Sequence, residues 1–135
     1  MINFDIIGKI KSKSRPRFTR NGRAYTAKTT SNYETFIQLS FLEANQKKIQ
    51  GNKPILAIIK CYFEIPNSYS KKRKKACIEG LEYPTKKPDS DNIAKIVLDS
   101  LNKIAYDDDK QVVKLCIFKQ YTEEQEKVNV KLLEL

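Results

Sequence analysis

Aspartates are concentrated in two short segments of the C-terminal half of the chain. The first is D-S-D-N at residues 89–92, and the second is the run Asp107, Asp108 and Asp109. Adjacent carboxylates repel one another, and this crowding becomes favourable when a divalent cation binds, because Mg²⁺ and Mn²⁺ require hard oxygen ligands. The two segments together therefore indicate a candidate divalent-metal site.

Lys95 lies four residues after Asp91 and four before Asp99, so the three side chains share one face of a helix. In an active site the Lys95 ammonium would neutralise charge that develops on a phosphate. In a purely structural interpretation, Asp91 and Lys95 form an ordinary i,i+4 ion pair worth about 0.2–0.5 kcal/mol. The spacing alone leaves both interpretations open.

Each acidic segment also has a structural interpretation. An aspartate at the start of a helix is a good cap, because its carboxylate accepts free backbone N–H groups, and an acidic turn is usually solvated. Spacing adds a difficulty, since a helix over about 91–104 would be about 20 Å long and would hold the acidic turn at its far end. The residues alone therefore do not bring Asp109 to Asp89 and Asp91.

The sequence contains no histidine, which excludes Ser-His-Asp and Cys-His catalysis, histidine-ligated zinc and imidazole acid–base chemistry. Its three cysteines form no C-x-x-C pair, and Cys61 and Cys116, in alternating apolar segments, are expected to be buried thiols. We expect no signal peptide and no membrane span, because no apolar run approaches about 20 residues. The expected compartment is the cytoplasm.

The formal charge of +10 is unevenly distributed. Residues 1–88 hold 19 Lys and Arg against 6 Asp and Glu, whereas residues 89–135 hold 7 against 10. A basic body with a compact acidic segment favours phosphate binding around a metal site, with nucleic acid as the partner. The K-K-R-K-K run would also suit a solvated face or a nuclear localisation signal. The candidate phosphate contacts are Arg15, Arg17, Arg20, Arg23, Lys71, Lys72, Arg73, Lys74, Lys75, Lys86 and Lys87.

Hydrophobic periodicity predicts one α+β domain over residues 1–135, with a mixed sheet of about four strands covered by two or three helices. The strands are expected at 1–10, 54–65, about 111–121 and about 126–134. The helices are expected at 32–48, 71–79 and about 91–104. An S-x-x-E capping box at Ser31 would open the first helix, and Ser70 and Gly80 would bound the second. Asn21-Gly22 predicts a hairpin within the basic segment.

Three motifs taken together resemble the RusA family of Holliday junction resolvases. They are K-P-D-S-D-N-I-A-K at 87–95, L-D-S-L-N at 98–102 and D-D-K-Q-V-V at 108–113. The basic R-P-R-F-T-R at 15–20 and Tyr25 are similar to the N-terminal segment of the family, and length and element order also fit. The D-x-D-N-x-x-K pattern followed by D-D-x-Q-V is specific, whereas either half alone would be weak.

The resemblance implies a homodimeric, Mg²⁺-dependent endonuclease, with Mn²⁺ as the alternative ion and no small-molecule cofactor. Such an enzyme cuts four-way DNA junctions by paired incisions in recombination and repair, and family members often travel with prophages. Carried over by motif, the catalytic residues are Asp89, Asp91, Asp109 and Lys95, and the three aspartates are the metal ligands. Asp107 makes a triplet where the family shows a pair, so Asp108 is the alternative third ligand.

Two other functions stay open on the sequence. The chain would also suit a non-catalytic protein that binds branched DNA, or a metal-dependent nuclease acting on flapped or other branched DNA. The intact set of carboxylates argues against the first of these. Cleavage of labelled junctions with and without Mg²⁺ separates the three functions.

Overall fold

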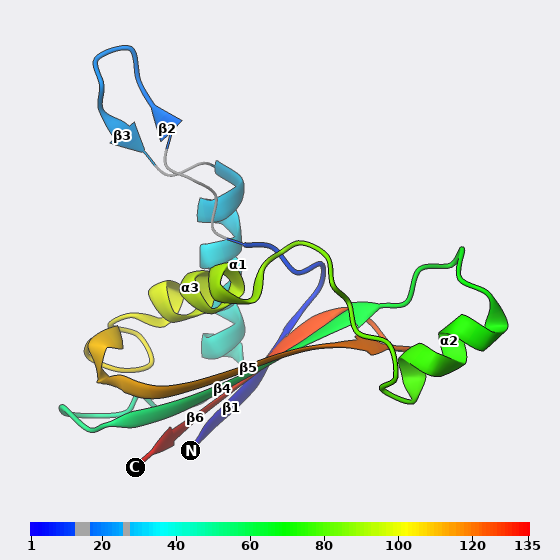
Figure 1. Ribbon diagram of the computed structural model, residues 1–135. Coiled ribbons are helices and arrows are strands. Elements are labelled where there is room, and N and C mark those ends of the chain that lie inside the picture. Colours follow the sequence, from blue (N-terminus) through cyan, green and yellow to red (C-terminus); the bar gives the residue numbers. More distant parts are fainter. Residues whose placement is uncertain (13–16, 26–27) are drawn as a thin grey trace.

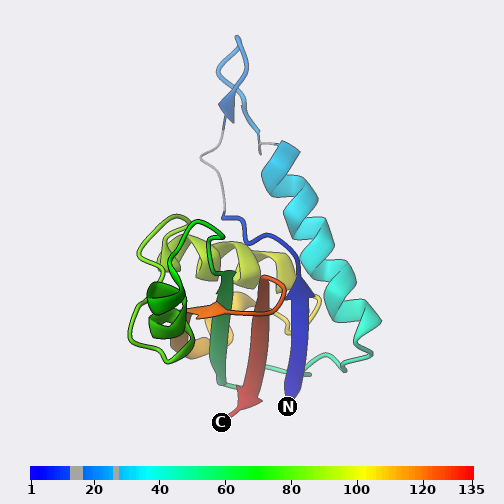
Figure 2. The ribbon, with the colours of Figure 1, turned by 90° about the vertical axis from the view of Figure 1, so that its right-hand side faces the viewer.

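Four strands form the main sheet of the protein, seen in a computed structural model that describes residues 1–12, 17–25 and 28–135, with only the backbone at 17, 18, 24, 25, 28 and 29. The strands are β1 (Ile2–Ile7), β4 (Ile55–Glu64), β5 (Val112–Thr122) and β6 (Lys127–Glu134). Their order is β1-β6-β4-β5, and Figure 2 shows the first three side by side. Only β4 and β5 run parallel among these strands, so the sheet is mixed, as predicted.

Alternation along the strands decides which face of the sheet becomes the core. In β4 the buried positions are Ile55, Ala57, Ile59, Cys61 and Phe63, and the residues between them are less buried. Figures 1 and 2 show α1 and α3 on one side of the sheet, over this apolar face. The other face carries no helix among the described residues. The fold is the α+β arrangement that the periodicity predicted.

The first helix, α1 (Lys28–Glu43), differs from its predicted range of 32–48. Ser31 lies inside the helix, and its carbonyl accepts a hydrogen bond from the Thr35 hydroxyl at 3.1 Å. The capping box predicted at Ser31 is therefore wrong. The helix ends early because Asn45 adopts a left-handed φ of 52°, a conformation typical of the residue after a helix.

The helix α2 (Lys71–Ile78) and the hairpin β2–β3 (Arg17–Phe18 and Ala24–Tyr25) agree with the predictions. The Ser70 hydroxyl caps α2 by accepting the backbone N–H of Arg73 at 3.2 Å, and Gly80 follows the helix with φ 75°. In the hairpin, Gly22 has φ 77°. Figure 1 shows the hairpin standing away from the sheet, while α2 lies at the opposite end of the protein.

The helix α3 (Ser90–Leu101) buries Ile93, Ile96, Val97 and Leu101, as predicted. It ends three residues earlier than the predicted Ile104, because Asn102 leaves the helical conformation and Lys103 adopts φ 68°. The turn that follows is anchored by buried Tyr106, whose hydroxyl donates to the Leu98 carbonyl at 2.6 Å. A single 3₁₀ turn, η1 (Asp109–Gln111), then leads directly into β5.

None of the described helices is long and apolar enough to cross a membrane.

The two cysteines that were expected to be buried have different outcomes. Cys61 is buried as predicted, but Cys116 is exposed, and the prediction for Cys116 is wrong. Alternation does not reveal that β5 is an edge strand, nor that Cys116 pairs with Ile58 on the face without helices.

Candidate functional site

Asp89 occupies the cap position of α3 without using its carboxylate as a cap. Its backbone carbonyl accepts the N–H of Ile93 at 3.0 Å, but its side chain makes no capping hydrogen bond among the described residues. The segment before it is held by Lys119 of β5, whose ammonium donates to the Pro88 carbonyl at 3.0 Å. The capping interpretation therefore explains the position of Asp89 and leaves its exposed carboxylate available.

Asp91 and Lys95 are both exposed on α3. Within the described part of the chain the two form no ion pair, although their i,i+4 spacing permits one. The ion pair that would give Lys95 a purely structural role is therefore not formed among these residues. One carboxylate and one ammonium stand side by side on the same exposed face of the helix.

The second acidic segment is attached to the other end of α3. The backbone N–H of Asp109 donates to the side-chain carbonyl of Asn102 at 3.2 Å. Burial raises the pKa of Asp109, and the neighbouring Asp108 and Asp99 carboxyls raise it further. Asp99, Asp108 and Asp109 are therefore neighbours. The pKa of Asp108 is lowered instead, because its carboxylate accepts the backbone N–H of Lys110 at 2.9 Å.

Gln111 fixes this acidic segment to the start of β5. Its buried side-chain amide donates to the carbonyls of Gly51 at 2.8 Å and Lys53 at 3.0 Å. The side-chain carbonyl accepts the N–H of Asp108 at 2.9 Å, so Asp108 and Gln111 cap η1 reciprocally. The glutamine of the D-D-x-Q-V motif has a positioning role that the sequence did not show.

Asp107 differs from the other two members of the acidic triplet. Its carboxylate forms an ion pair with Lys48 at 2.9 Å, on the chain that follows α1. Asp108 and Asp109 remain beside Asp99. This arrangement favours the pair Asp108–Asp109 over Asp107, as the motif comparison does.

Asp99 belongs to this neighbourhood, although the sequence analysis did not include it among the site residues. Its spacing gave the available signal, since Asp91, Lys95 and Asp99 recur every four residues. Asn102 follows three residues later and binds Asp109. The polar face of α3 therefore continues from the exposed Asp91 to the acidic turn.

The structure does not bring the predicted metal ligands together within one chain. Asp91 and Asp99 are eight residues apart on α3, which is about 12 Å along the helix axis. Among the described residues no group of three Asp, Glu, Cys or His side chains is arranged to hold a metal ion. The donors have the chemistry that Mg²⁺ prefers, but a single chain does not assemble Asp89, Asp91 and Asp109.

Comparison with known proteins assigns the chain to a family. Residues 8–133 match the family of the endodeoxyribonuclease RusA. The chain belongs to the RusA family. An uncharacterized protein of Bacillus subtilis (strain 168), YqaN, is 38% identical over 128 residues, which cover 91% of this chain and 89% of that protein. RusA membership implies a nuclease, with Holliday junction resolution as the activity that the family suggests.

Two of the predicted DNA contacts of the RusA-like N-terminal segment lie in the hairpin. Arg20 and Arg23 are exposed in the turn between β2 and β3. Arg15 lies outside the described residues, and the side chain of Arg17 is also outside them. The hairpin thus presents at least two guanidinium groups to solvent.

Lys71, Lys72 and Lys75 of α2 are exposed and Lys74 is half-buried, whereas the arginine of the helix has partners within the protein. Arg73 stacks on the Tyr69 ring at 3.6 Å and donates to the Glu82 carboxylate at 2.9 Å. Lys75 has only a loose contact of 3.8 Å with Glu79. The remaining predicted contacts are exposed or half-buried, namely Lys71, Lys72, Lys74, Lys86 and Lys87.

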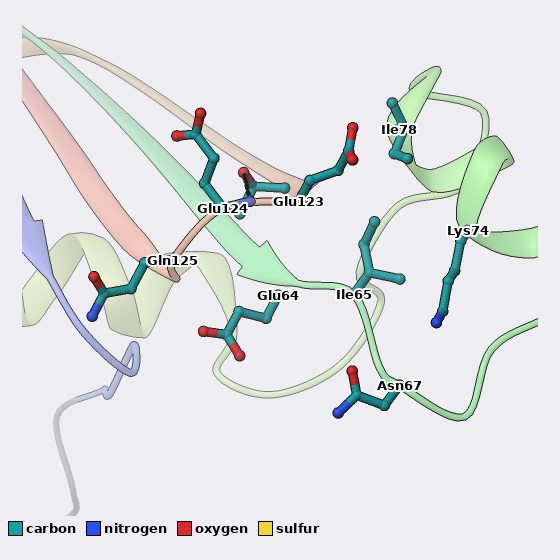
Figure 3. A pocket seen from close by; sticks show the side chains of 9 residues that line it. Glu64, Ile65, Asn67, Lys74, Ile78, Glu123, Glu124 and Gln125 are labelled. Atoms are coloured by element: carbon teal, nitrogen blue, oxygen red, sulfur yellow. Dashed lines mark hydrogen bonds between the residues drawn. The ribbon is translucent and has the colours of Figure 1, made fainter. Parts of the chain in front are cut away.

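The protein surface also has a hollow of about 490 Å³ between the end of β4, α2 and the β5–β6 turn (Figure 3). Glu64, Glu123 and Glu124 line it, with Lys74 at one side. Three glutamates would repel a phosphate. None of the residues lining the hollow belongs to the α3 site.

Proposed function

We propose that this protein is a divalent-metal-dependent endonuclease that resolves four-way DNA junctions by paired phosphodiester hydrolysis, acting as a homodimer. The observation that carries the proposal is the exposed set of Asp89, Asp91 and Lys95 at the start of α3, in a chain that matches RusA over residues 8–133. Among the described residues, neither a capping hydrogen bond nor an ion pair involves these side chains. Their availability supports a catalytic role.

Each element has a role in this proposal. Lys95 stabilises negative charge on the phosphate, and the aspartates supply hard oxygen donors. The chain has no histidine that could activate a water molecule, and a divalent ion would supply that activation. The hairpin arginines and the lysines of α2 hold the DNA backbone, because Lys and Arg contacts to phosphate position a protein without reading sequence.

One observation favours a second function. Since the described residues of one chain hold no complete metal group, a non-catalytic protein that binds branched DNA is the alternative. That protein would bind a four-way junction equally well with Mg²⁺ or EDTA and would cut nothing. A nuclease for other branched DNA would cut flaps as readily as four-way junctions.

The proposal is tested with labelled four-way, flap and linear DNA incubated with Mg²⁺ or with EDTA. We expect cleavage of the four-way junction with Mg²⁺ alone, and its loss in Asp91→Asn while junction binding persists. Asp5→Asn is the matched control, because Asp5 is a carboxylate on β1 that pairs with Lys127 at 3.4 Å. Full activity of Asp91→Asn would exclude this site.

A further inference from the structure

We propose that Lys119 is a positioning residue for cleavage: its ammonium anchors the loop before α3 and thereby fixes the place of Asp89. The anchoring stands on the structure alone. Its effect on cleavage rests on the proposed function, because Asp89 is one of the catalytic residues proposed for that activity.

Lys119 interrupts an apolar series on β5. It is paired with Cys61 of β4, which is buried on the face of the sheet under the helices. Its neighbours on the same face of β5 are Ile117 and Tyr121, which pack against the core. The alternation therefore calls for an apolar side chain at this position. A half-buried lysine there needs polar partners for its charge.

The partners of the Lys119 ammonium are backbone carbonyls of the loop between α2 and α3. It donates to the carbonyls of Lys86 and Pro88, the second at 3.0 Å. It also lies 5.4 Å from the centroid of the buried Phe63 ring, which is a cation–π contact. Hydrogen bonds from an ionised donor are stronger than those between neutral groups. Two such bonds, on either side of Lys87, fix the direction in which the chain enters α3.

This anchor matters for Asp89 because no cap holds its carboxylate among the described residues. The backbone of Asp89 is fixed on its helical side, where its carbonyl accepts the Ile93 N–H at 3.0 Å. On the other side the preceding residue is Pro88, whose carbonyl binds Lys119. The position of the Asp89 carboxylate therefore depends on Lys119 as well as on α3.

The same anchor connects Asp89 to two predicted DNA contacts. Lys86 and Lys87 lie in the anchored loop, and both are exposed. The Lys86 ammonium lies 5.6 Å from the centroid of the Phe63 ring, so Lys86 and Lys119 approach the same ring. Fixing the backbone at residues 86 and 88 sets the spacing between these cations and Asp89. A DNA phosphate bound by the cations would therefore be held at a constant distance from the carboxylate.

Lys119 differs from Lys95 in how it acts. Lys95 is exposed on α3 and is proposed to contact the phosphate, whereas the Lys119 ammonium is bound to carbonyls of the protein. Lys119 therefore acts through Asp89, and its loss should leave DNA binding largely intact. Residues that orient a metal ligand or catalytic side chain in this way typically contribute about 10–100-fold to activity.

The anchor is tested first by hydrogen exchange, which needs no activity. In Lys119→Met the side chain keeps its length and suits the apolar face, but it has no donor for the two carbonyls. We expect faster amide exchange in a peptide that spans residues 81–95 and unchanged exchange in β4 and β6. Lys119→Arg retains a donor and should keep the slow exchange. Wild-type exchange in Lys119→Met, or an equal increase over the whole sheet, would overturn the anchor.

Lys114→Met is the matched control for the loss of a lysine. Lys114 is an exposed lysine of the same strand, and its pairing with Leu56 places it on the face without helices. Because it lies on the opposite face from the anchored loop, its replacement should leave the exchange of residues 81–95 unchanged. Faster exchange of this loop in Lys114→Met would overturn the specific role of Lys119.

The effect on cleavage is tested with a labelled four-way junction in single-turnover reactions at saturating protein. Lys119→Met should lower the rate by about 10–100-fold, while the dissociation constant from fluorescence anisotropy stays near its wild-type value. Lys119→Arg should recover part of the rate, and Lys114→Met should retain all of it. An unchanged rate in Lys119→Met, or a loss of binding as large as the loss of cleavage, would overturn the positioning role. A wild-type protein that cuts no junction would overturn the proposed function, and the exchange measurement would still decide the anchor.

Discussion

At the scale of single residues, two charged groups that the sequence motifs marked clearly have no ion-pair partner in the part of the chain that the structure describes. Asp91 and Lys95 are exposed, and the i,i+4 ion pair that would explain them structurally is not formed among the described residues. Asp107 and Arg73, in contrast, belong to charged runs of the sequence but form ion pairs within the protein, Asp107 with Lys48 and Arg73 with Glu82. Neighbouring charges in a run therefore have different roles, and their spacing in the sequence does not distinguish one role from the other.

Lys95 is predicted to act on the chemical step. Lys95→Gln should lower the single-turnover cleavage rate of a four-way junction by about 10²–10³, the typical effect of removing one group that stabilises transition-state charge. Junction binding, measured by fluorescence anisotropy, should change little. An equal loss of binding and cleavage would instead make Lys95 a DNA contact.

Arg73 is predicted to stabilise the fold, and its neighbour Lys72 to bind DNA. Arg73→Ala removes the contacts with the Tyr69 ring and the Glu82 carboxylate, so its Tm should fall. Lys72→Ala removes only an exposed charge and should keep the wild-type Tm while weakening junction binding. Thermal unfolding and fluorescence anisotropy of the two variants test these separate roles of Arg73 and Lys72. Equal Tm values for the two variants would contradict them.

Glu82 gives this cluster a pH dependence. The pKa of Glu82 lies below its ordinary value of 4.5, because its carboxylate accepts from Cys77 at 3.0 Å and from Arg73. A depressed folded-state pKa means that the stabilisation is present above pH 4.5 and is lost as pH falls toward the folded-state value. The Tm difference between wild type and Glu82→Gln should therefore shrink on acidification. A difference that stays constant from pH 7 to pH 3 would contradict it.

At the scale of elements, periodicity located the strands and helices, whereas their ends and neighbours depended on tertiary contacts. The alternating residues of β4 and the apolar face of α3 are buried as predicted. The predicted cap at Ser31 failed because α1 begins before it. The sequence also did not distinguish an edge strand from a central one: β5 was expected to alternate, but it has a neighbour on one side only and its burial does not alternate as that of β4 does. Pairing order is a long-range property that local patterns do not contain.

Gln111 is the residue that links an element to the site. Gln111→Ala should lower the free energy of unfolding by about 1–3 kcal/mol, because the buried Gln111 side chain gives up its hydrogen bonds to the carbonyls of Gly51 and Lys53. It should also reduce cleavage more than junction binding, because the backbone N–H of Asp108 loses the Gln111 side-chain carbonyl that accepts its hydrogen bond. Urea denaturation gives the first value. A variant with wild-type stability and cleavage would exclude the positioning role.

At the scale of the whole molecule, the unequal charge along the sequence becomes a separation in space. The basic hairpin stands away from the sheet and the basic α2 lies at the opposite end of the protein, with α3, which carries Asp91, between them (Figure 1). The fold and the family could be predicted from the sequence. The assembly of the site could not, because the two acidic segments lie at opposite ends of α3 and their spacing in the sequence does not say what would bring them together.

Electrostatic binding to DNA should follow from this distribution. The logarithm of the junction-binding constant should fall linearly with the logarithm of salt concentration, and each lost phosphate contact should flatten the slope by about 0.9. Arg20→Gln should flatten it, whereas Lys53→Gln should not, because Lys53 pairs with Glu134 at 3.2 Å. Binding that is insensitive to salt would contradict a phosphate-based footprint.

The central claim is that this RusA-family chain cuts four-way junctions with a divalent metal. It is tested most directly by mapping cuts on each strand of a labelled junction, beside a linear duplex of the same sequence. The account predicts symmetric cuts in two opposing strands of the junction with Mg²⁺, none with EDTA, and an intact duplex. An uncut junction, or a duplex cut as efficiently as the junction, would contradict it.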